Sequence, residues 1–221
     1  MPLTALDFCN LAIGKISGDR IADFGEDSPL AVFCAEQWPQ KRRTLLGKYR
    51  WNFANTIRLL SGVAIGATET AVMAHKFMVP ADMIDAVHAF RDQADPYRAE
   101  RTPHVMLANG FFWADEATVY GEYTGERAEA LWPGYFVELG LYAFAADLAG
   151  FAQLTTLQRT YEAKAWGTPQ ENGEGGLYLT ARNEDARMAP PRQLVSGVDA
   201  GPLIGARFSG ANTFIDRFGI R

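Results

Sequence analysis

Histidine and cysteine are scarce in this chain, which has three histidines and two cysteines among its 221 residues. Cys9 and Cys34 are too few for a four-thiolate zinc site, and no CxxC motif is present. A disulfide between them is one alternative, but both lie in apolar patterns typical of helices, where a reduced core thiol is the usual case. We therefore expect no metal or cofactor site built on cysteine.

The three histidines do not form an HxH or HxxxH pair; they are His75, His88 and His104. Isolated histidines of this kind are more often structural than catalytic. The alternative is a site assembled in space from these histidines and a pair of carboxylates, which would support metal or acid–base chemistry. The acidic pairs available for such a site are Asp115 with Glu116, Glu126 with Glu129, and Glu184 with Asp185.

Positive charge is not in excess, because 21 lysines and arginines face 26 acidic residues, for a net charge of −5. This excludes a polycationic nucleic-acid-binding protein, which needs surplus positive charge to neutralise phosphates. The charge is also uneven along the chain. Residues 1–60 carry eight basic and six acidic residues, residues 61–169 carry seven and fourteen, and residues 170–221 carry six of each.

Long apolar runs and several enzyme motifs are missing as well. No window approaches the roughly 18 consecutive apolar residues of a membrane-spanning helix, and the first residues lack the basic and apolar pattern of a signal peptide. We therefore expect the protein to fold in a reducing cytoplasm. The phosphate-binding P-loop pattern fails around Gly14 and Lys15, and the GxSxG pattern of hydrolases fails around Ser209 and Gly210.

Helical patterns dominate the first 60 residues. Thr4 precedes Asp7 by three positions, which predicts a helix with a capping box, and Ser28 followed by Pro29 predicts the start of a second helix. Pro39 should kink or break that second helix, because proline lacks a backbone donor. A further helix is expected from Trp51 to Leu60.

Strand patterns occupy the middle of the chain. The Asn109–Gly110 pair lies between two apolar segments and predicts a β-hairpin. After this region, helical spacing returns from Trp132 to Ala146, and Thr155 three positions before Gln158 predicts another capped helix. The expected strands are residues 71–79, 83–90, 104–108, 111–114 and 118–123.

Glycine and proline are frequent after residue 168, so the sequence predicts an extended arm over residues 169–221. Apolar residues nevertheless recur along it, a pattern that favours an arm ordering against a partner. A flexible C-terminus that contains hydrophobic residues is the alternative. The proposed apolar anchors are Leu177, Tyr178, Leu179, Leu203, Ile204, Phe208, Phe214 and Phe218.

These patterns predict an α+β fold: a helical bundle with an inserted small antiparallel β-sheet domain and an extended C-terminal arm. The expected parts are N-terminal helices over 1–69, the inserted sheet over 70–124, helices completing the bundle over 125–168, and the arm over 169–221.

An ordered set of short motifs runs through the first half of the chain. A basic helix leads to a Trp-Asn-Phe-Ala segment and an Arg-Leu pair, and a strand then ends in Pro-Ala-Asp. These motifs have the character of fold determinants: Trp51 and Phe53 are expected to bridge two core layers, and Asn52 to bond backbone at a junction. The motif residues are Trp51, Asn52, Phe53, Ala54, Arg58, Pro80 and Asp82. This set resembles the tail tubular protein A family, the head-to-tail adaptors, or gatekeepers, of short-tailed phages.

The resemblance implies a structural virion protein rather than an enzyme, without cofactor, assembled in the host cytoplasm and placed in the neck or tail. It implies a ring of twelve subunits between the portal protein and a tail nozzle or tail tube protein, with DNA passing through the lumen during genome ejection without specific binding. The thin helix around Gly140 and a basic segment are expected subunit or partner contacts; that segment holds Lys41, Arg42, Arg43, Lys48 and Arg50. The alternatives are a tail terminator or completion ring, and an α+β enzyme with a His/carboxylate site.

Overall fold

The computed structural model describes residues 2–65, 73–84, 87–94, 101–102, 105–106 and 110–188. All of these residues belong to one compact unit, Met1–Ala189. Five α-helices lie in this described part: α1 (Ala5–Ile13), α2 (Pro29–Gly47), α3 (Gly134–Phe151), α4 (Thr155–Trp166) and α5 (Gly176–Met188). Short 3₁₀ helices are η1 (Asn52–Ala54), η2 (Glu129–Leu131) and η3 (Pro169–Glu171).

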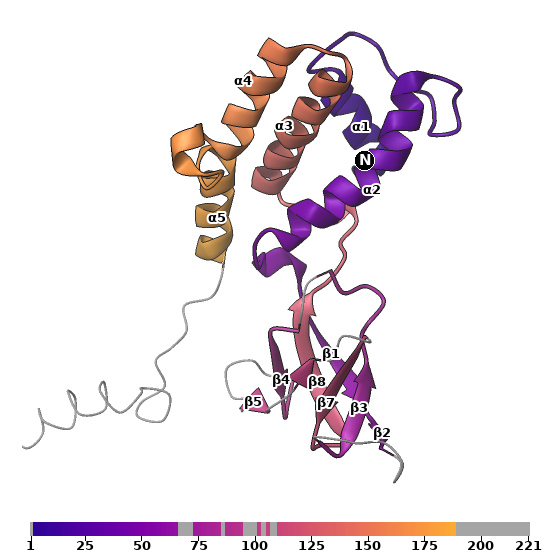
Figure 1. Cartoon of the computed structure of the whole chain (residues 1–221), viewed down its shortest axis with the longest axis vertical. Coiled ribbons are helices and arrows are strands. Elements are labelled where there is room, and N and C mark those ends of the chain that lie inside the picture. The colour runs from indigo at the N-terminus through magenta and orange to yellow at the C-terminus, as the bar shows by residue number, and fades with distance from the viewer. Residues whose placement is uncertain are drawn as a thin grey trace, which may run out of the picture. The chain divides into compact units, whose positions relative to one another are not determined.

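The strands follow α2 and precede α3 in the chain (Figure 1). They form two antiparallel four-stranded sheets in the orders β1-β8-β4-β5 and β2-β3-β7-β6. The prediction of an α+β fold with an inserted antiparallel sheet region is therefore confirmed. The strands are β1 (Asn55–Ser61), β2 (Val63–Ala64), β3 (His75–Met78), β4 (Ala89–Arg91), β5 (Arg101–Thr102), β6 (Val105–Met106), β7 (Phe111–Ala114) and β8 (Thr118–Thr124).

Helix starts follow the predicted local chemistry at two sites. The Thr4 side chain accepts the backbone N–H of Asp7 at 3.1 Å, and the Asp7 carboxylate accepts the backbone N–H of Thr4, which completes the capping box. Ser28 accepts the backbone N–H of Ala31 at 3.2 Å at the start of α2. The expected cap at Thr155 is wrong, because α4 begins at that residue and Leu154 occupies the N-cap position without a side-chain bond.

The hairpin predicted at Asn109–Gly110 is confirmed by the antiparallel pairing of β6 with β7. Gly110 has a φ of 77°, a left-handed conformation that glycine adopts without a steric penalty. Pro39 does not break its helix, because α2 runs through it from Pro29 to Gly47.

The helix expected from Trp51 to Leu60 is wrong. One 3₁₀ turn, η1, leads directly into β1, which pairs with β8 in continuous register from Asn55 opposite Thr124 to Ser61 opposite Thr118. Leucine and arginine favour helices only weakly, and a seven-residue ladder with β8 outweighs that preference. The first sheet therefore begins at residue 55, so the predicted boundaries of 1–69 and 70–124 are wrong here.

The extended arm predicted from residue 169 is also wrong over its first 20 residues. The η3 turn and α5 occupy this segment, and α5 packs against α3 and α4. Tyr178 and Ala181 of α5 are buried in the helical core. Because that burial stabilises α5 despite the neighbouring glycines, the bundle extends to residue 188, well past the predicted boundary of 168.

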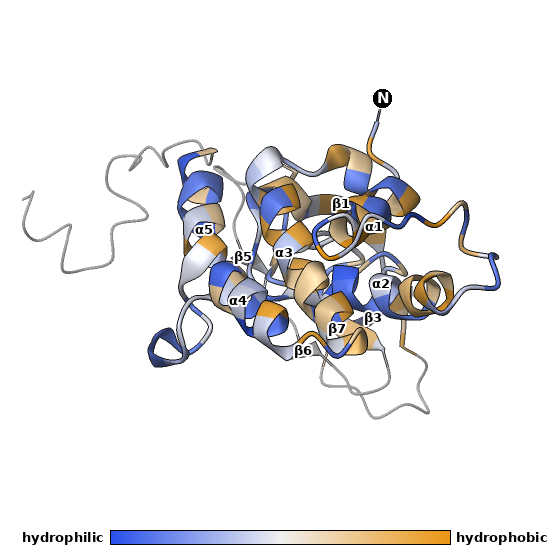
Figure 2. Ribbon diagram, turned by 90° about the horizontal axis from the view of Figure 1, so that it is seen from above, coloured by the Kyte–Doolittle hydropathy of each residue, from blue (hydrophilic) through white to orange (hydrophobic). Residues whose placement is uncertain are grey.

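The helical core is rich in aromatic side chains. Phe8 of α1 stacks on Trp38 of α2 with ring centroids 4.2 Å apart, and it meets Trp132 edge-on at 5.5 Å. Gly140 of α3 allows this packing, because a Cβ there would lie only 3.0 Å from the Phe8 ring. Most of α3 is hydrophobic in Figure 2, in keeping with its nine buried residues. The surface expected around Gly140 is therefore part of the core, and it is not available to a partner.

The sheets have a smaller core of their own, built around Phe77, Phe90 and Phe112. The ring centroid of Phe90 in the first sheet lies 5.7 Å from that of Phe77 and 5.4 Å from that of Phe112, both in the second sheet. The two sheets therefore pack against each other through these side chains. Trp51 and Phe53 were expected to bridge two core layers, but both pack on Phe136 of the helical core, at 4.9 and 4.8 Å.

Candidate functional site

The chain passes from the helices to the sheets through Trp51–Ala54, the Trp-Asn-Phe-Ala motif of the sequence analysis. Trp51 is fully buried, and its indole N–H donates to the Leu45 carbonyl at 3.0 Å, which ties the segment back to the end of α2. Ala54 is also fully buried, and its carbonyl accepts the backbone N–H of Gly125 at 2.9 Å, where the chain leaves β8. The entry to the sheets and the exit from them are thus joined at this segment.

Asn52 connects the same segment to α5. Its backbone N–H donates to the Asp185 carboxylate at 2.8 Å, and its side-chain amide donates to the Asp185 carboxylate and carbonyl, both at 2.9 Å. The expectation that Asn52 bonds backbone at a junction is therefore confirmed. Tyr135 of α3 donates to the same carboxylate at 2.8 Å. Burial and this acceptor raise the pKa of Tyr135, so its hydroxyl stays protonated and donating.

The remaining motif residues, Arg58, Pro80 and Asp82, lie at or beside the first sheet. Arg58 of β1 lies 3.6 Å from the Asp82 carboxylate, and the Tyr123 hydroxyl of β8 donates to that carboxylate at 3.1 Å. Burial raises the pKa of Tyr123, which keeps this donor protonated. Pro80 is buried, and its carbonyl accepts the N–H of Met83 at 3.1 Å in the turn that presents Asp82. The Asp82 carboxylate thus accepts a hydrogen bond from the Tyr123 hydroxyl and pairs with the Arg58 guanidinium.

Glu122 is the centre of a buried charge cluster where β8 meets the helices. Its carboxylate accepts bonds from Arg91 Nε at 2.8 Å and Arg91 Nη2 at 2.6 Å, and from the Asn55 side chain at 3.0 Å. Arg91 binds Oε2 of the carboxylate, whereas Arg50 pairs with Oε1, the oxygen that also accepts the bond from Asn55. Burial by itself raises the pKa of Glu122, but the bonds from Arg91 and Asn55 and the charge of Arg50 outweigh it, and the pKa lies below its ordinary value.

The basic segment expected to contact a partner is largely engaged within the chain. Arg42 pairs with Glu126 and with the buried Glu129, which also accepts the Trp38 indole N–H at 2.8 Å. Lys41 pairs with Asp147 at 2.6 Å.

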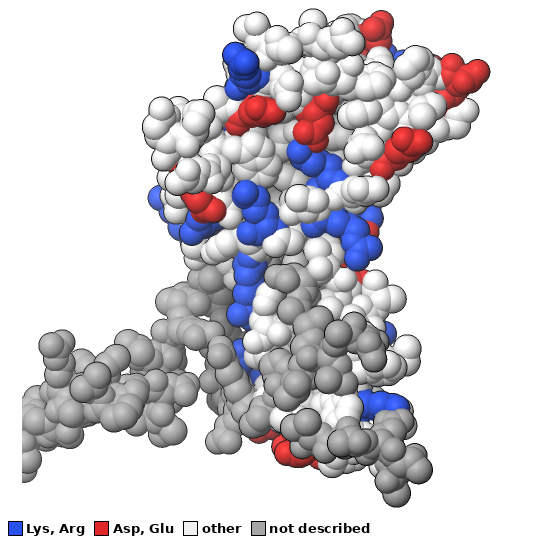
Figure 3. Space-filling model, in the orientation of Figure 1, with Lys and Arg blue, Asp and Glu red and all other residues white. Residues whose placement is uncertain are grey.

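Two further members of that segment also have partners of their own. Lys48 lies over the ring of Trp166, 4.8 Å from its centroid, and Arg50 pairs with Glu122. In contrast, Arg43 is exposed and has no acidic partner among the described residues. Lysine and arginine side chains are visible where the helices meet the sheets in Figure 3, in agreement with these pairs. Four of the five residues expected to contact a partner therefore also have partners within the chain, and their contact with another protein stays a prediction.

The first three predicted anchors of the arm lie in α5. Tyr178 is buried against Trp51 and Trp166, and Leu177 packs on the helical core, so these two stabilise their own bundle. Leu179 is 44% exposed. The remaining predicted anchors lie outside the described residues; they are Leu203, Ile204, Phe208, Phe214 and Phe218.

The two described histidines have separate partners. His75 Nδ1 lies 2.9 Å from the Asp115 carbonyl on one sheet, whereas His88 Nε2 lies 2.9 Å from the Thr124 hydroxyl on the other. His104 lies outside the described residues. Within the part of the chain that the structure describes, no three histidine, cysteine, aspartate or glutamate side chains are grouped to hold a metal ion.

Several large apolar side chains are exposed in the described part of the unit, and two sets of them are named here. On the helices, Val32, Phe151 and Leu154 are 43–46% exposed, and Phe151 lies against Phe33 with ring centroids 4.5 Å apart. On the sheets, Val63 of β2 and Met78 of β3 are 63% and 75% exposed. We call these the helical patch and the sheet patch. Sequence reasoning missed both, because each depends on which face of an element the fold covers.

Sequence reasoning considered Asp185 and Glu129 only as members of acidic pairs, and it did not single out Glu122 and Arg91. A charged residue inside an apolar strand, such as Glu122 between Gly121 and Tyr123, is the available indication of a buried ion pair.

No family model matches the chain, and no curated protein is significantly similar to it. In the described residues no helix has both the length and the apolar character needed to span a membrane.

Proposed function

We propose that this protein is a ring-forming head-to-tail adaptor of a tailed phage, placed between the portal and the tail. The observation that carries the proposal is the spatial organisation of the motifs that resemble the tail tubular protein A family. Trp51–Ala54 joins the last turn of α2 to the first strand, and Arg58 lies 3.6 Å from Asp82. Trp51–Ala54 thus ties the sheets to the helices, and Arg58 and Asp82 meet within the sheet region, as expected of fold determinants in an adaptor.

A second support is the ion pair of Arg50 with Glu122, which connects the chain just after α2 to the first sheet. Glu122 and Arg91 are each about 4% exposed and bond through two short contacts, and Arg50 just after α2 pairs with the same carboxylate. A buried pair with several hydrogen bonds fixes geometry more than it adds stability. A ring subunit that contacts one partner through its helices and another through its sheets needs such a fixed orientation.

The exposed apolar patches supply a third support. A closed ring requires a heterologous interface, in which each subunit presents two different complementary surfaces. The helical patch of Val32, Phe151 and Leu154 and the sheet patch of Val63 and Met78 differ in composition and location. We assign subunit contacts to these patches, because the basic segment is mostly engaged within the chain. Within the same proposal, the anchors of residues 189–221 bind the portal.

The deciding experiment measures the mass and symmetry of assemblies of the full-length chain, alone and mixed with the portal protein of the same virus. Light scattering coupled to size exclusion gives the mass, and class averages from electron microscopy give the symmetry. We expect a twelvefold ring on the portal. A chain ending at Met188 should keep its melting temperature and lose portal binding, because α5 is retained and the apolar anchors are removed.

Two results would contradict this proposal. A sixfold ring that binds tail tube protein and ignores the portal would support the tail terminator alternative. A chain that remains monomeric with both partners, while its circular dichroism shows a folded protein, would exclude an adaptor role.

A further inference from the structure

The loop that follows α1 borders a hollow that the proposed function does not use. Its volume is about 360 Å³, which lies within the range of small-molecule sites in proteins. Its walls are the last turn of α1, the loop up to Arg20, and Leu141 of α3. The hollow is therefore built by parts of the chain that are far apart in sequence.

Positive charge exceeds negative charge in the lining of this hollow. Lys15 and Arg20 line it, and in the part of the chain that the structure describes neither side chain forms an ion pair with an acid. Asp19 is the one acidic residue among the described residues of the lining. Two cations that converge on a hollow without acidic partners attract an anion.

A third cation lies close to Lys15. The ammonium groups of Lys15 and of Lys164 in α4 lie 5.2 and 3.7 Å from the centre of the Tyr142 ring. Lys164, and to a lesser extent Lys15, hold the pKa of the Tyr142 hydroxyl below its ordinary value. Nearby positive charge stabilises the anionic form of a group in this way, so the surface beside the hollow favours anions.

The loop is held in place by bonds within the chain. The Asn10 side chain accepts the backbone N–H of Ile21 at 2.9 Å and donates to the Ile21 carbonyl at 3.0 Å. The Tyr161 hydroxyl donates to the Lys15 carbonyl at 2.6 Å. These bonds fix the loop before any ligand arrives, which lowers the entropy cost of binding.

The loop backbone also offers hydrogen-bond donors to the hollow. The N–H groups of residues 15–17 bond to the carbonyls of Ala12 and Ile13, so these ends of α1 are already satisfied. Among the described residues, the N–H groups of Gly18 and Arg20 have no acceptor, and open space lies where a side chain of Gly18 would begin. Backbone N–H groups of this kind bind the oxygens of anions.

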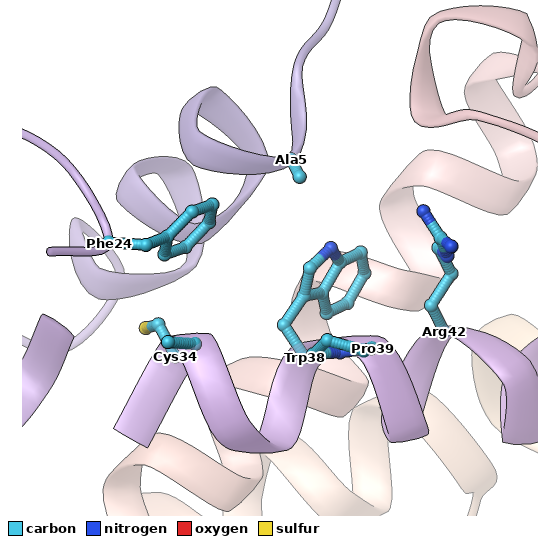
Figure 4. A pocket seen from close by; sticks show the side chains of 7 residues that line it. Ala5, Phe24, Cys34, Trp38, Pro39 and Arg42 are labelled. Atoms are coloured by element: carbon cyan, nitrogen blue, oxygen red, sulfur yellow. The ribbon is translucent and has the colours of Figure 1, made fainter. Parts of the chain in front are cut away.

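A second, smaller hollow lacks this excess of positive charge. Its volume is about 190 Å³, and it lies between α2 and the ring of Phe24 (Figure 4). Arg42 is the charged residue of its lining, and it pairs with Glu126 and Glu129. Because that cation is already neutralised, the smaller hollow does not attract an anion.

We propose that the hollow beside Lys15 and Arg20 binds the phosphate group of a small phosphate monoester, whose organic part lies against Leu11 and Leu141. A phosphate monoester carries up to two negative charges and three acceptor oxygens, enough for the two side chains and the loop N–H groups. Leu11 is 47% exposed and lines the same hollow as Leu141, so an aromatic or aliphatic group can cover both. The inference is independent of the adaptor role, since neither exposed apolar patch takes part in it.

The test titrates ¹⁵N-labelled full-length protein with phenyl phosphate in a buffer of low ionic strength that contains no phosphate. We expect saturable shifts of backbone amide signals in two-dimensional NMR spectra, centred on residues 15–20. Inorganic phosphate should shift the same signals and bind severalfold more weakly, because it lacks a ring to contact the two leucines. Phenol has the ring without the phosphate and should bind more weakly still.

Substitutions at exposed positions separate the contributions. Lys15→Gln and Arg20→Gln should each weaken binding of phenyl phosphate severalfold, whereas Asp19→Asn should strengthen it by removing a like charge. Leu11→Ser should weaken phenyl phosphate and leave inorganic phosphate unchanged. Arg43→Gln is the matched control, since Arg43 is an exposed cation that does not line the hollow.

The measurement on the wild-type chain needs no substitution, so it stands even if a variant folds poorly. Folded protein that shows no saturable shifts with phenyl phosphate would overturn the inference. Equal losses of binding in Arg20→Gln and Arg43→Gln would also overturn it, because they would indicate unspecific attraction by net charge. Shifts of these amides with duplex DNA and none with phenyl phosphate would assign the cations to a nucleic-acid contact instead.

Discussion

Asn52 and Asp185 lie 133 positions apart and are joined by three hydrogen bonds, two to the carboxylate and one to the carbonyl of Asp185. Asp185 is fully buried, and Tyr135 donates a further bond to it at 2.8 Å. A buried carboxylate without a cationic partner must be stabilised by such donors. This contact fixes α5 to the segment where the chain turns from the helices into the sheets.

Replacing Asp185 by alanine should therefore be strongly destabilising. The Asn52 backbone N–H and the half-buried Tyr135 hydroxyl would lose their acceptor, whereas the exposed Asn52 amide would keep the carbonyl of residue 185. Because these donors are only partly buried, each loss should cost about 1 kcal/mol, at the low end for such groups. We expect the free energy of unfolding, measured by urea titration, to fall by about 2 kcal/mol.

Glu184→Ala is the matched control, because the neighbouring Glu184 is partly exposed and pairs with Arg187 on the helix surface. Its loss should cost well below about 1 kcal/mol, as usual for a surface ion pair. Equal effects of the two substitutions would show that the Asp185 contact does not hold α5 in place.

Glu122 should make stability depend on pH. Its pKa is lower in the folded chain than its ordinary value of 4.5, so the stability it contributes is fully present above 4.5 and is lost as the pH falls through the folded value. Glu122→Gln removes the charge opposite the buried Arg91 and should cost about 3 kcal/mol at pH 7. The difference in the free energy of unfolding between wild type and Glu122→Gln should become smaller at acid pH.

Urea unfolding at several pH values from 7 to below 4 measures that difference. Glu116→Gln, at an exposed position in the connection between β7 and β8, serves as the control and should follow the wild-type curve. Parallel curves for wild type and Glu122→Gln down to the lowest pH would mean that Glu122 does not carry the dependence.

Arg42 and Arg43 form a natural matched pair. Arg42 pairs with Glu126 and with Glu129, which is only 5% exposed, whereas Arg43 is exposed and has no acidic partner among the described residues. Arg42→Ala leaves the buried Glu129 with Trp38 as its hydrogen-bond donor and should cost about 2 kcal/mol. Arg43→Ala should change stability by less than about 0.5 kcal/mol, which thermal and urea unfolding can resolve.

The ring interface gives a prediction on assembly. Leu154→Ser in the helical patch and Met78→Ser in the sheet patch should each weaken ring formation with little loss of stability, because both side chains are already exposed. Leu131→Ser, at a residue that is 66% exposed but belongs to neither patch, is the control. Rings of unchanged mass and stability in both patch variants would remove the patches from the interface.

Much of the fold could be predicted because its signals act over short distances. The Thr4–Asp7 capping box, the Ser28 cap and the turn at Gly110 depend on atoms within four residues of each other. Such local chemistry is readable from sequence. The α+β class followed from the change of apolar spacing between residues 60 and 130.

The candidate site was less accessible to prediction. The motif Trp51–Ala54 was identified, and Asn52 was correctly expected to bond backbone, but its partner Asp185 lies in a segment that had been predicted to be extended. The ion pairs of the basic segment were not predicted, because nothing in the sequence shows that Arg42 and Arg50 meet acids more than 70 positions away.

The chain alone thus determined where α1 and α2 start, that a hairpin lies near Gly110, and that histidine and cysteine are scarce. Tertiary structure decided that β1 is a strand, that α5 completes the bundle, and which charges are engaged. The physical reason is that intrinsic preferences differ by less than about 1 kcal/mol per residue, whereas pairing with β8 and burial of Tyr178 act on whole elements at once.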